Sequence, residues 1–481
     1  MTQPTPAALS NEEVARQVQG ALAPLDVVSL DANLDLPEEI TIGRVRRRGP
    51  AEADDVRILS LVDVDGVLLW EDGPIRPSVD GVRRAARAVR TVQGDVVAQV
   101  KYVKPLGIND VLQKLHKLDA SLTPEAAPQP VVTGQAAIPG GAAGAQLLSY
   151  DLNTWAHTRI AAAPASGSIL LLIHGTFSST TKLVDELKLH PKFVAMCHRY
   201  DHVLGFEHFT VSRAPVVNAA ELARLFAGHQ GAVDIICHSR GGLVARWFVE
   251  MLDPFRTTRK TRVVFVGCPL QGTSLADPAS LRHGINLMTN IGRVLGQGAS
   301  LVPFLQAASG LMQIVSSIGS IAGRTPLVDV GIGLLPGIGA KSRIVNNSEL
   351  NALNYGAPAD RTNYFAVSSS FSSEGTAWQF CRLFNKLANA AAEYLVFEQE
   401  NDLVVDTSSM THFVFGPSPN MKNTSRFRVF GGADNVHHTS YFRELSTVDF
   451  IDTSFENQIK LMKPLRTRKA PNHSGQSPAA S

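Results

Sequence analysis

The sequence predicts an α/β protein in which a mostly parallel β-sheet is covered by helices on both faces. Continuous Val/Ile/Leu runs, such as 169–173, 233–237 and 262–266, are typical of strands that are buried on both faces. Stretches with the apolar spacing of helices separate these runs, and a parallel sheet requires this alternation. The 481 residues are 44% hydrophobic and 18% charged, so the chain can bury a large core.

The first part of the chain, residues 1–121, is predicted to be a small accessory domain, either α+β or β-rich. Its apolar pattern predicts strands at 26–30, 39–45, 56–64, 67–70 and 96–103 and a helix at 82–92. Two Arg-rich stretches, 44–48 and 83–90, have acidic residues interspersed, which favours a solvated face over a site for a charged partner.

A linker is predicted at residues 122–145. This stretch is rich in Pro, Ala, Gly and Gln, and it cannot bury enough apolar surface to offset the entropy of ordering it. The basic and then Ser/Pro/Ala-rich residues 463–481 are predicted to form a disordered tail. Between these two segments, residues 146–462 are predicted to form the main domain. Its strands are expected at 146–150, 158–162, 168–173, 202–206, 233–237, 262–266, 364–367 and 426–430.

The main domain contains a long apolar stretch without charges. Residues 294–323 carry no charged side chain, and their length alone would allow a membrane span. Gly, Pro, Gln and Ser interrupt the stretch, which favours buried or lid helices that cover a pocket. We therefore predict a cap or lid insertion at about 281–348, with membrane-surface contact through 294–323 as the alternative.

Charge and cysteine usage exclude several classes of function. The net charge of +2 gives no global field for nucleic acid. The cysteines of the chain are scattered singly, and its amino end lacks the pattern of a secretory signal. A cytoplasmic protein with reduced thiols is therefore expected. His198, His202 and His208 are not spaced like metal ligands, and no phosphate-binding or dinucleotide motif is present. We expect neither a metal nor a cofactor.

The strongest local signal is a strand, a sharp turn and a helix around Ser239. The buried run 233–237 leads into Cys237-His-Ser-Arg-Gly241, and apolar residues at helical spacing follow until Asp253-Pro254. A nucleophile elbow needs this arrangement, because small residues on both sides of the serine let strand and helix approach each other. Cys237 stands where a glycine is usual. The alternative role for Ser239 is the N-cap of a core helix.

A second element upstream favours the catalytic interpretation. The buried run 169–173 ends in His174-Gly175-Thr176, and a glycine there lets the following main-chain N–H groups face a developing oxyanion. We predict an oxyanion hole made by the main-chain N–H groups of Thr176 and Arg240. His174 is expected to hydrogen-bond the loop that it begins.

A serine nucleophile needs a histidine base and an orienting carboxylate further along the chain. His437 and His438 follow the last predicted strand, and only one of two neighbours in an extended turn is expected to face Ser239. Asp402 is the preferred acid, because the turn-forming Asn-Asp pair precedes an apolar run. Asp434 is the second choice, and Asp406 is a further candidate.

These motifs resemble those of the α/β-hydrolase superfamily, in its lipase and esterase branch. The similarity lies in the segments that follow three strands and in the turn around Asp402, namely 174–177, 237–242, 266–275 and 401–405. Segments 206–210, 218–219, 238–244 and 438–442 are similar to a group of bacterial hydrolase domains, some of them fused to caspase-like peptidase domains. The resemblance covers about residues 146–462. It implies an α/β-hydrolase fold, acyl transfer by a Ser-His-Asp triad, and His438 rather than His437 as the base.

The sequence therefore predicts a serine hydrolase that cleaves carboxylic esters, in which Ser239 attacks, His438 carries the proton and Asp402 orients the imidazole. A lipid-like ester is expected because the apolar insertion could line an acyl-chain pocket. The alternative is a non-catalytic or partner-regulated interaction module that uses the same fold.

Overall fold

The structure is a computed structural model of the whole chain. It describes residues 10–25, 57–64, 67–74, 95–102, 108–127, 145–255, 257–276, 284–286, 289–290, 305, 307–315, 335–339, 341, 347–355, 363–371, 400–412 and 425–461. The strands predicted at 26–30 and 39–45, the helix at 82–92, both Arg-rich stretches and the tail 463–481 lie outside these residues. So do most of the predicted linker and much of the predicted insertion.

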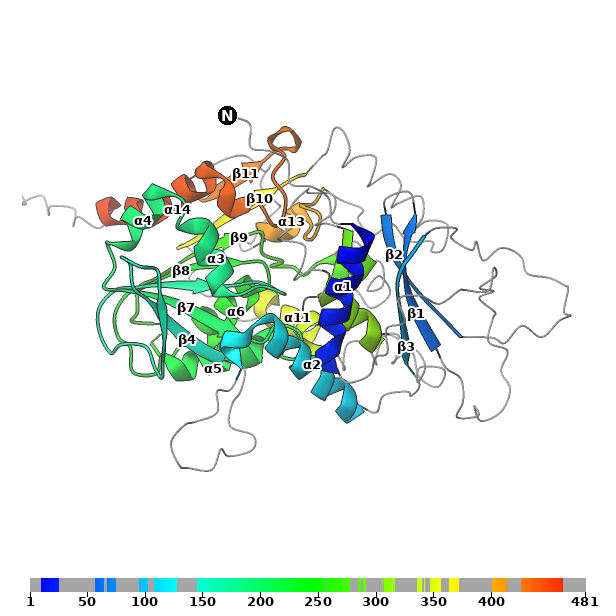
Figure 1. Ribbon diagram of the computed structural model, residues 1–481. Helices are drawn as coiled ribbons and strands as arrows, with labels where there is room; N and C mark the ends of the chain where they lie inside the picture. Colours follow the sequence, from blue (N-terminus) through cyan, green and yellow to red (C-terminus); the bar gives the residue numbers. More distant parts are fainter. Residues whose placement is uncertain are drawn as a thin grey trace, which may run out of the picture.

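An eight-stranded sheet forms the centre of the molecule, with the strand order β11-β10-β9-β8-β6-β7-β4-β5 (Figure 1). Neighbouring strands are parallel except at β4, which is antiparallel to both β5 and β7. All eight strands predicted for the main domain are present, with small shifts at their ends. They are β4 (Ala145–Tyr150), β5 (His157–Ile160), β6 (Ile169–Ile173), β7 (His202–His208), β8 (Val233–His238), β9 (Thr261–Val266), β10 (Tyr364–Ser369) and β11 (Phe427–Phe430).

Helices cover both faces of this sheet. On β6, Leu171 packs with one core and Leu172 with the other, because successive side chains point to opposite faces. The strand order, the helical layers and a sharp turn after β8 make the fold that of an α/β hydrolase, as the sequence predicts. The helices of this part are α3 (Thr180–Leu187), α4 (Pro191–Cys197), α5 (Pro215–Leu225), α6 (Gly241–Arg246), α10 (Pro336–Gly339), α11 (Ser348–Tyr355), α13 (Thr407–Met410) and α14 (Leu445–Leu461).

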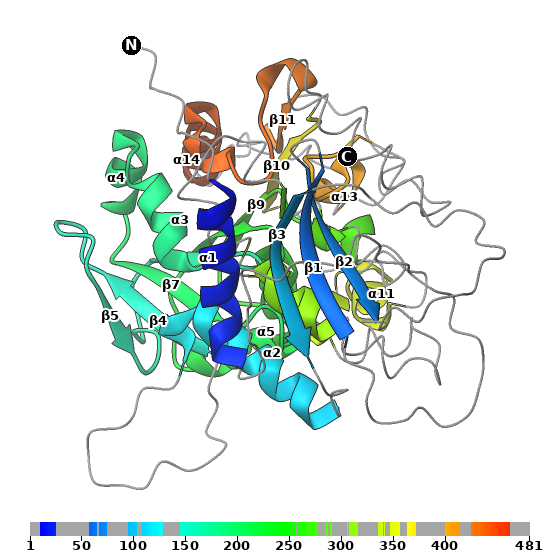
Figure 2. The same cartoon turned by 45° about the vertical axis from the view of Figure 1, so that its right-hand side comes forward.

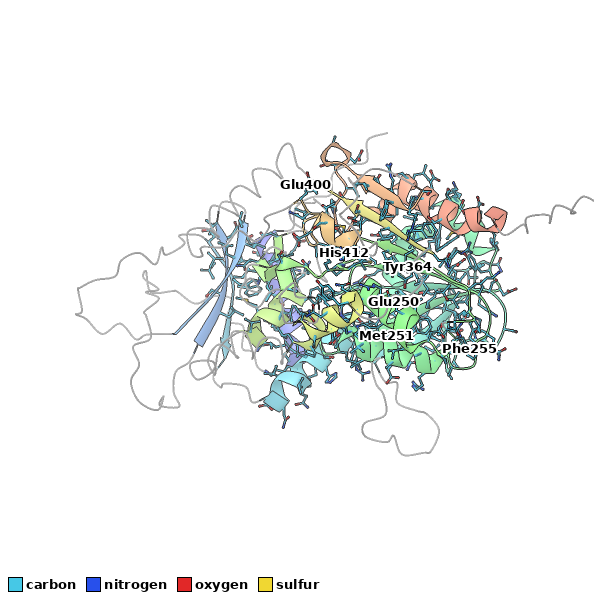
Figure 3. All side chains as sticks on the ribbon, turned by 180° about the vertical axis from the view of Figure 1, so that it is seen from behind. Glu250, Met251, Phe255, Tyr364, Glu400 and His412 are labelled. Carbon is cyan, nitrogen blue, oxygen red and sulfur yellow. The ribbon has the colours of Figure 1, made fainter. Side chains whose placement is uncertain are left out.

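The helix α6 continues as a π-helical turn, η3 (Trp247–Leu252), which ends at Asp253. A buried ion pair holds this junction, since Arg246 Nε lies 2.7 Å from Glu250 Oε1. The hydroxyl of Tyr364, at the start of β10, donates to the same oxygen of Glu250 at 3.2 Å (Figure 3). The helix that follows the elbow is thereby fixed to the central sheet.

In the first part of the chain, the described residues form an antiparallel three-stranded sheet and the α-helices α1 and α2. The sheet has the order β2-β1-β3, and its strands are β1 (Arg57–Val64), β2 (Val67–Pro74) and β3 (Asp95–Tyr102). The helices α1 (Asn11–Leu22) and α2 (Ile108–Leu122) were not predicted. The side chain of Ser10 accepts the N–H of Glu13 and the Glu13 carboxylate accepts the N–H of Ser10, so a capping box starts α1.

This first part shares a hydrophobic core with described residues of the segment between β9 and β10, where the sequence predicts an insertion. The helix α1 lies against β3 (Figure 2), and the turn η2 (Pro124–Ala126), which follows α2, contacts β4 and β7. Helical residues 307–315 are mostly buried in this core, and a Cβ on Gly310 would lie 2.8 Å from Leu118 of α2. The core also contains Phe177 of the hydrolase domain. No helix in the described part of the chain is long and apolar enough to span a membrane.

Side-chain amides join the insertion to the small sheet. The Asn290 amide accepts the N–H of Leu68 at 2.7 Å and donates to the carbonyl of the same residue at 2.6 Å. Asn286 accepts the N–H of Trp70 on the same strand at 2.9 Å. The two amides therefore satisfy main-chain groups of β2 as a further strand would.

The carboxylate of Asp119, near the end of α2, is fully buried and anchors the segment after β7. It accepts the main-chain N–H groups of Thr210, Val211 and Ser212 at 2.9, 3.0 and 2.6 Å, respectively. Thr210 Oγ1 in turn accepts the N–H of Phe177 at 3.3 Å. The first part of the chain thus supports the loop that follows β6.

Replacing Asp119 by alanine would leave three buried N–H groups without acceptors. Since each such group costs about 1–3 kcal/mol, we expect Asp119→Ala to lower the free energy of unfolding by about 3 kcal/mol or more. Asp185→Ala, on the exposed side of α3, should change it by about 0.5 kcal/mol or less. Urea denaturation followed by circular dichroism measures both variants, and equal midpoints for the two would refute the anchoring role.

Candidate active site

The turn after β8 places Ser239 in a strained backbone conformation. Its φ is +52°, which is uncommon for a residue other than glycine. The Ser239 N–H donates to the carbonyl of Val266 on β9 at 3.0 Å, which fixes the turn to the neighbouring strand. The serine remains 7% exposed, so its hydroxyl is not sealed in the core. This is the strand-turn-helix geometry of a nucleophile elbow, as predicted from the sequence.

Glycines around the turn allow unusually close contacts. A Cβ on Gly241 would lie 2.6 Å from the carbonyl oxygen of Ile173, and one on Gly242 would lie 2.6 Å from Cys268 Cβ. Cys237 takes the position before the turn that is usually a glycine, and it is fully buried. These contacts bring the ends of β6, β8 and β9 together beneath Ser239.

The loop after β6 lies directly against the elbow. A Cβ on Gly175 would lie 2.7 Å from Ser239 Cβ. Phe177 has a φ of +58°, so this loop is strained as well. Among the described residues, neither the main-chain N–H of Thr176 nor that of Arg240 donates to a protein acceptor. The described residues thus leave both predicted oxyanion donors without a protein acceptor.

His174 holds this loop from inside, as the sequence predicts. Its Nδ1 lies 2.9 Å from the Gly175 carbonyl, and its Nε2 accepts the N–H of His208 at 3.2 Å. Nδ1 therefore carries the proton. Burial lowers the pKa of His174 to about 3, so the imidazole is neutral at physiological pH.

Asp402 and His438 form a buried hydrogen-bonded pair. His438 Nδ1 lies 2.8 Å from Asp402 Oδ2, and the His438 N–H donates to the Asp402 carbonyl at 3.0 Å. The other carboxylate oxygen accepts the N–H groups of Val404 and Val405 at 3.0 and 2.8 Å. Tyr441 also donates its hydroxyl to Asp402 Oδ2 at 2.9 Å. Because Nδ1 faces the carboxylate, the Nε2 of His438 is left to accept a proton from elsewhere.

His238 connects this pair to the elbow. Its Nε2 lies 2.9 Å from the His438 carbonyl, and the centroids of the two imidazole rings are 4.8 Å apart. Burial, together with the neighbouring His438, lowers the pKa of His238 to about 3, so its Nε2 can donate as a neutral group. No hydrogen bond joins Ser239 to His438 in the part of the chain that is described. Catalytic hydrogen bonds are often long in unliganded enzymes and shorten when substrate binds.

The alternative candidates for the base and the acid have other partners. His437 Nδ1 lies 3.2 Å from Thr439 Oγ1, and its ring meets the edge of Phe371. Asp434 is exposed, and its carboxylate accepts the N–H of Gly431 at 2.8 Å. Asp406 precedes α13 and accepts the hydroxyl of Ser274 at 3.2 Å. Asp402 is thus a candidate acid that the structure bonds to one of the two histidines, His438.

Three structural residues were missed by the sequence analysis. Asp119 supports the loop after β6, His238 fixes His438, and Tyr441 completes the partners of Asp402. His238 lies beside Ser239 in the elbow motif, so it could have been singled out as a candidate. The sequence contains no comparable signal for Asp119.

The sequence matches the family described as "Domain of unknown function (DUF7379)" over residues 144–456. The chain belongs to this family. A search of curated proteins finds no match. Within the DUF7379 region lie β4 to β11 and the predicted site residues.

Several solved structures are similar to the DUF7379 chain at low identity. A mature lipase from Bacillus licheniformis, BlEst2, is 17% identical, with 63% of this chain and 93% of the lipase covered and a TM-score of 0.29. For lipase 1 from Pelosinus fermentans the identity is 14%, the coverages are 59% and 96%, and the TM-score is 0.36. A hyperthermophilic esterase from the archaeon Pyrobaculum calidifontis is 11% identical, with coverages of 74% and 92% and a TM-score of 0.31.

The contact between Gly175 and Ser239 can be tested by stability. Gly175→Ala would insert a methyl group 2.7 Å from Ser239 Cβ, and we expect it to lower the free energy of unfolding by about 1–3 kcal/mol. In the control, Gly228→Ala, the methyl group meets nothing within 4 Å, and a change of about 0.5 kcal/mol or less is expected. Urea denaturation separates the two, and an unchanged midpoint for Gly175→Ala would show that the loop does not touch the elbow.

Proposed function

We propose that the protein is a serine hydrolase that cleaves carboxylic esters through Ser239, His438 and Asp402. The observation that carries the proposal is the Asp402–His438 pair, bonded at 2.8 Å and connected through His238 to a strained Ser239. A carboxylate that binds Nδ1 of an imidazole fixes the tautomer in which Nε2 is a base. The order serine, acid, histidine along the chain is that of an α/β hydrolase.

In the proposed mechanism, the Ser239 hydroxyl attacks the ester carbonyl while His438 Nε2 accepts its proton. The main-chain N–H groups of Thr176 and Arg240 stabilise the oxyanion that develops on the carbonyl oxygen. His438 then protonates the leaving alcohol, and an acyl group remains bonded to Ser239. Water, deprotonated by the same imidazole, releases the acid and restores the serine. Asp402 stays ionised and stabilises the imidazolium form of His438.

We further propose that the acyl group of the substrate ester is lipid-like. Its support is the apolar surrounding of the loop after β6, since Phe177 packs in one core with Leu311 and Met312 of the insertion. Apolar surface of this kind is typical of sites that bind acyl chains. The insertion at about 281–348 would then act as the cap over the ester.

The nucleophile can be tested by covalent labelling and turnover. A fluorophosphonate probe should label the wild-type protein stoichiometrically, and the protein should hydrolyse short 4-nitrophenyl esters. Ser239→Ala should lose the label and lower kcat by about 10⁴-fold or more, whereas Ser446→Ala on α14 should retain both. Full esterase activity in Ser239→Ala would refute the mechanism. A wild-type protein that is neither labelled nor active would favour the non-catalytic interaction module.

The two remaining triad members have matched controls in the chain. His438→Gln and Asp402→Asn should each lower kcat by about 10³-fold or more, because the base or its correct tautomer is lost. His437→Gln and Asp434→Asn change the neighbouring histidine and the exposed carboxylate, and both should stay near the wild-type rate. Steady-state kinetics on one ester measures all four variants. A larger loss in either control than in its partner would reassign that role.

A further inference from the structure

Lys341 is a buried lysine beside the proposed oxyanion hole, and no described residue is its carboxylate partner. Lys341 follows α10, its side chain is only 8% exposed, and its Nζ donates to Thr176 Oγ1 at 2.7 Å. Its main chain is fixed at both ends, since its N–H donates to Ile338 and its carbonyl accepts the N–H of Thr273 at 2.8 Å. The position of the ammonium group is therefore set by the fold.

The backbone around Lys341 connects the two sides of the site. Thr273, which donates its N–H to the Lys341 carbonyl, also donates its hydroxyl to the carbonyl of Val404 at 2.5 Å. Val404 lies in the turn that Asp402 caps. The lysine side chain then extends to Thr176, on the oxyanion side. Its ammonium group is therefore bonded to the residue that follows Gly175, which lies against Ser239.

No described residue compensates the charge of this ammonium group. Among the described residues, no carboxylate lies within ion-pair distance of Lys341, and the nearby charge that acts on it is the cation of Arg240. Burial, and then the charge of Arg240, lower the pKa of Lys341 to about 7. Buried charges in proteins are normally paired, because desolvation without a partner is costly. An ammonium group has three donors, and Thr176 uses one of them.

The side chain of Arg240 adds a second cation with an unused donor. The guanidinium is fully buried and donates Nε to the carbonyl of Gly337 at 3.2 Å and Nη2 to the carbonyl of Arg213. Its Nη1 has no hydrogen-bond partner among the residues that the structure describes. Asp119 and Glu349 act on this charge from a distance, but no carboxylate forms an ion pair with it in the described part of the chain. Gly337 lies four positions before Lys341. The Arg240 guanidinium is therefore bonded to the same stretch of chain that carries Lys341.

We propose that Lys341, assisted by Arg240, binds an anionic group of the substrate, a carboxylate or a phosphate that lies close to the scissile ester. The inference rests on the proposed function and narrows it to anionic esters. An anion bound there would supply the missing partner of the ammonium group and use its free donors. Lys341 is a specificity residue in this scheme, and neutral esters would still react at Ser239.

The test compares anionic and neutral esters of equal acyl length. Monomethyl succinate is compared with methyl butyrate by pH-stat, which places the charge on the acyl side. Release of oleate from oleoyl lysophosphatidic acid and from monooleoylglycerol, in the same detergent micelles, places the charge on the alcohol side. We expect kcat/KM of the wild type to favour the anionic member of at least one pair by about tenfold or more.

Lys341→Met should remove this preference, because it raises KM for the anionic ester by about tenfold more than KM for the neutral ester. Lys341→Arg keeps the charge and should retain most of the preference. Lys188→Met, at the half-exposed residue that follows α3, is the matched control and should behave as the wild type. Inorganic phosphate should inhibit neutral-ester hydrolysis competitively in the wild type and much more weakly in Lys341→Met.

Two results would overturn the inference. One is a wild type that cleaves neutral esters but shows no preference in either pair. The other is a Lys341→Met variant whose kcat falls equally for both members of a pair at constant KM, which would place the lysine on the oxyanion instead of a substrate anion. If the wild type cleaves no ester and Ser239 is not labelled by a fluorophosphonate, the proposed function itself has failed.

Discussion

The conformation of Ser239 is the constraint on which the rest of the site depends. A φ of +52° is unfavourable for serine, and it persists because the surrounding contacts permit no other path for the chain. Its N–H is bonded to β9, Gly175 touches its Cβ, and Gly241 packs against the end of β6. Three neighbouring strands thus meet at one residue. Strain also appears at Phe177 and Leu403, which adjoin Thr176 and Asp402.

The central sheet brings residues from distant parts of the sequence to this point. Parallel strands end at the same edge, so the loops after β6, β8, β10 and β11 converge there. The first part of the chain contributes too, because Asp119 fixes the segment that holds Phe177. The hydrophobic core shared by α2, the insertion and Phe177 makes these parts one packed unit around the site. A change in the first part can therefore reach the oxyanion loop through direct contacts.

The sequence predicts some of these features well because they leave local signals. Buried parallel strands leave continuous apolar runs, and the elbow requires small residues around Ser239. The helices α1 and α2 were missed although Ser10 and Glu13 form a capping box and the apolar residues of α2 have helical spacing. Asp119 and Lys341 leave no such signal, since their partners are 91 and 165 residues away along the chain. The choice between His437 and His438 also requires the fold, which alone shows which ring meets Asp402.

The most direct test is a crystal structure of the protein after reaction with a fluorophosphonate ester. If Ser239 is the nucleophile, phosphorus will be bonded to its Oγ, and the unesterified oxygen will lie about 2.7–3.1 Å from the main-chain nitrogens of Thr176 and Arg240. His438 will keep its bond to Asp402 and turn Nε2 towards Ser239. Phosphorus bonded to another residue, or an oxygen pointing away from both nitrogens, would contradict the proposed site.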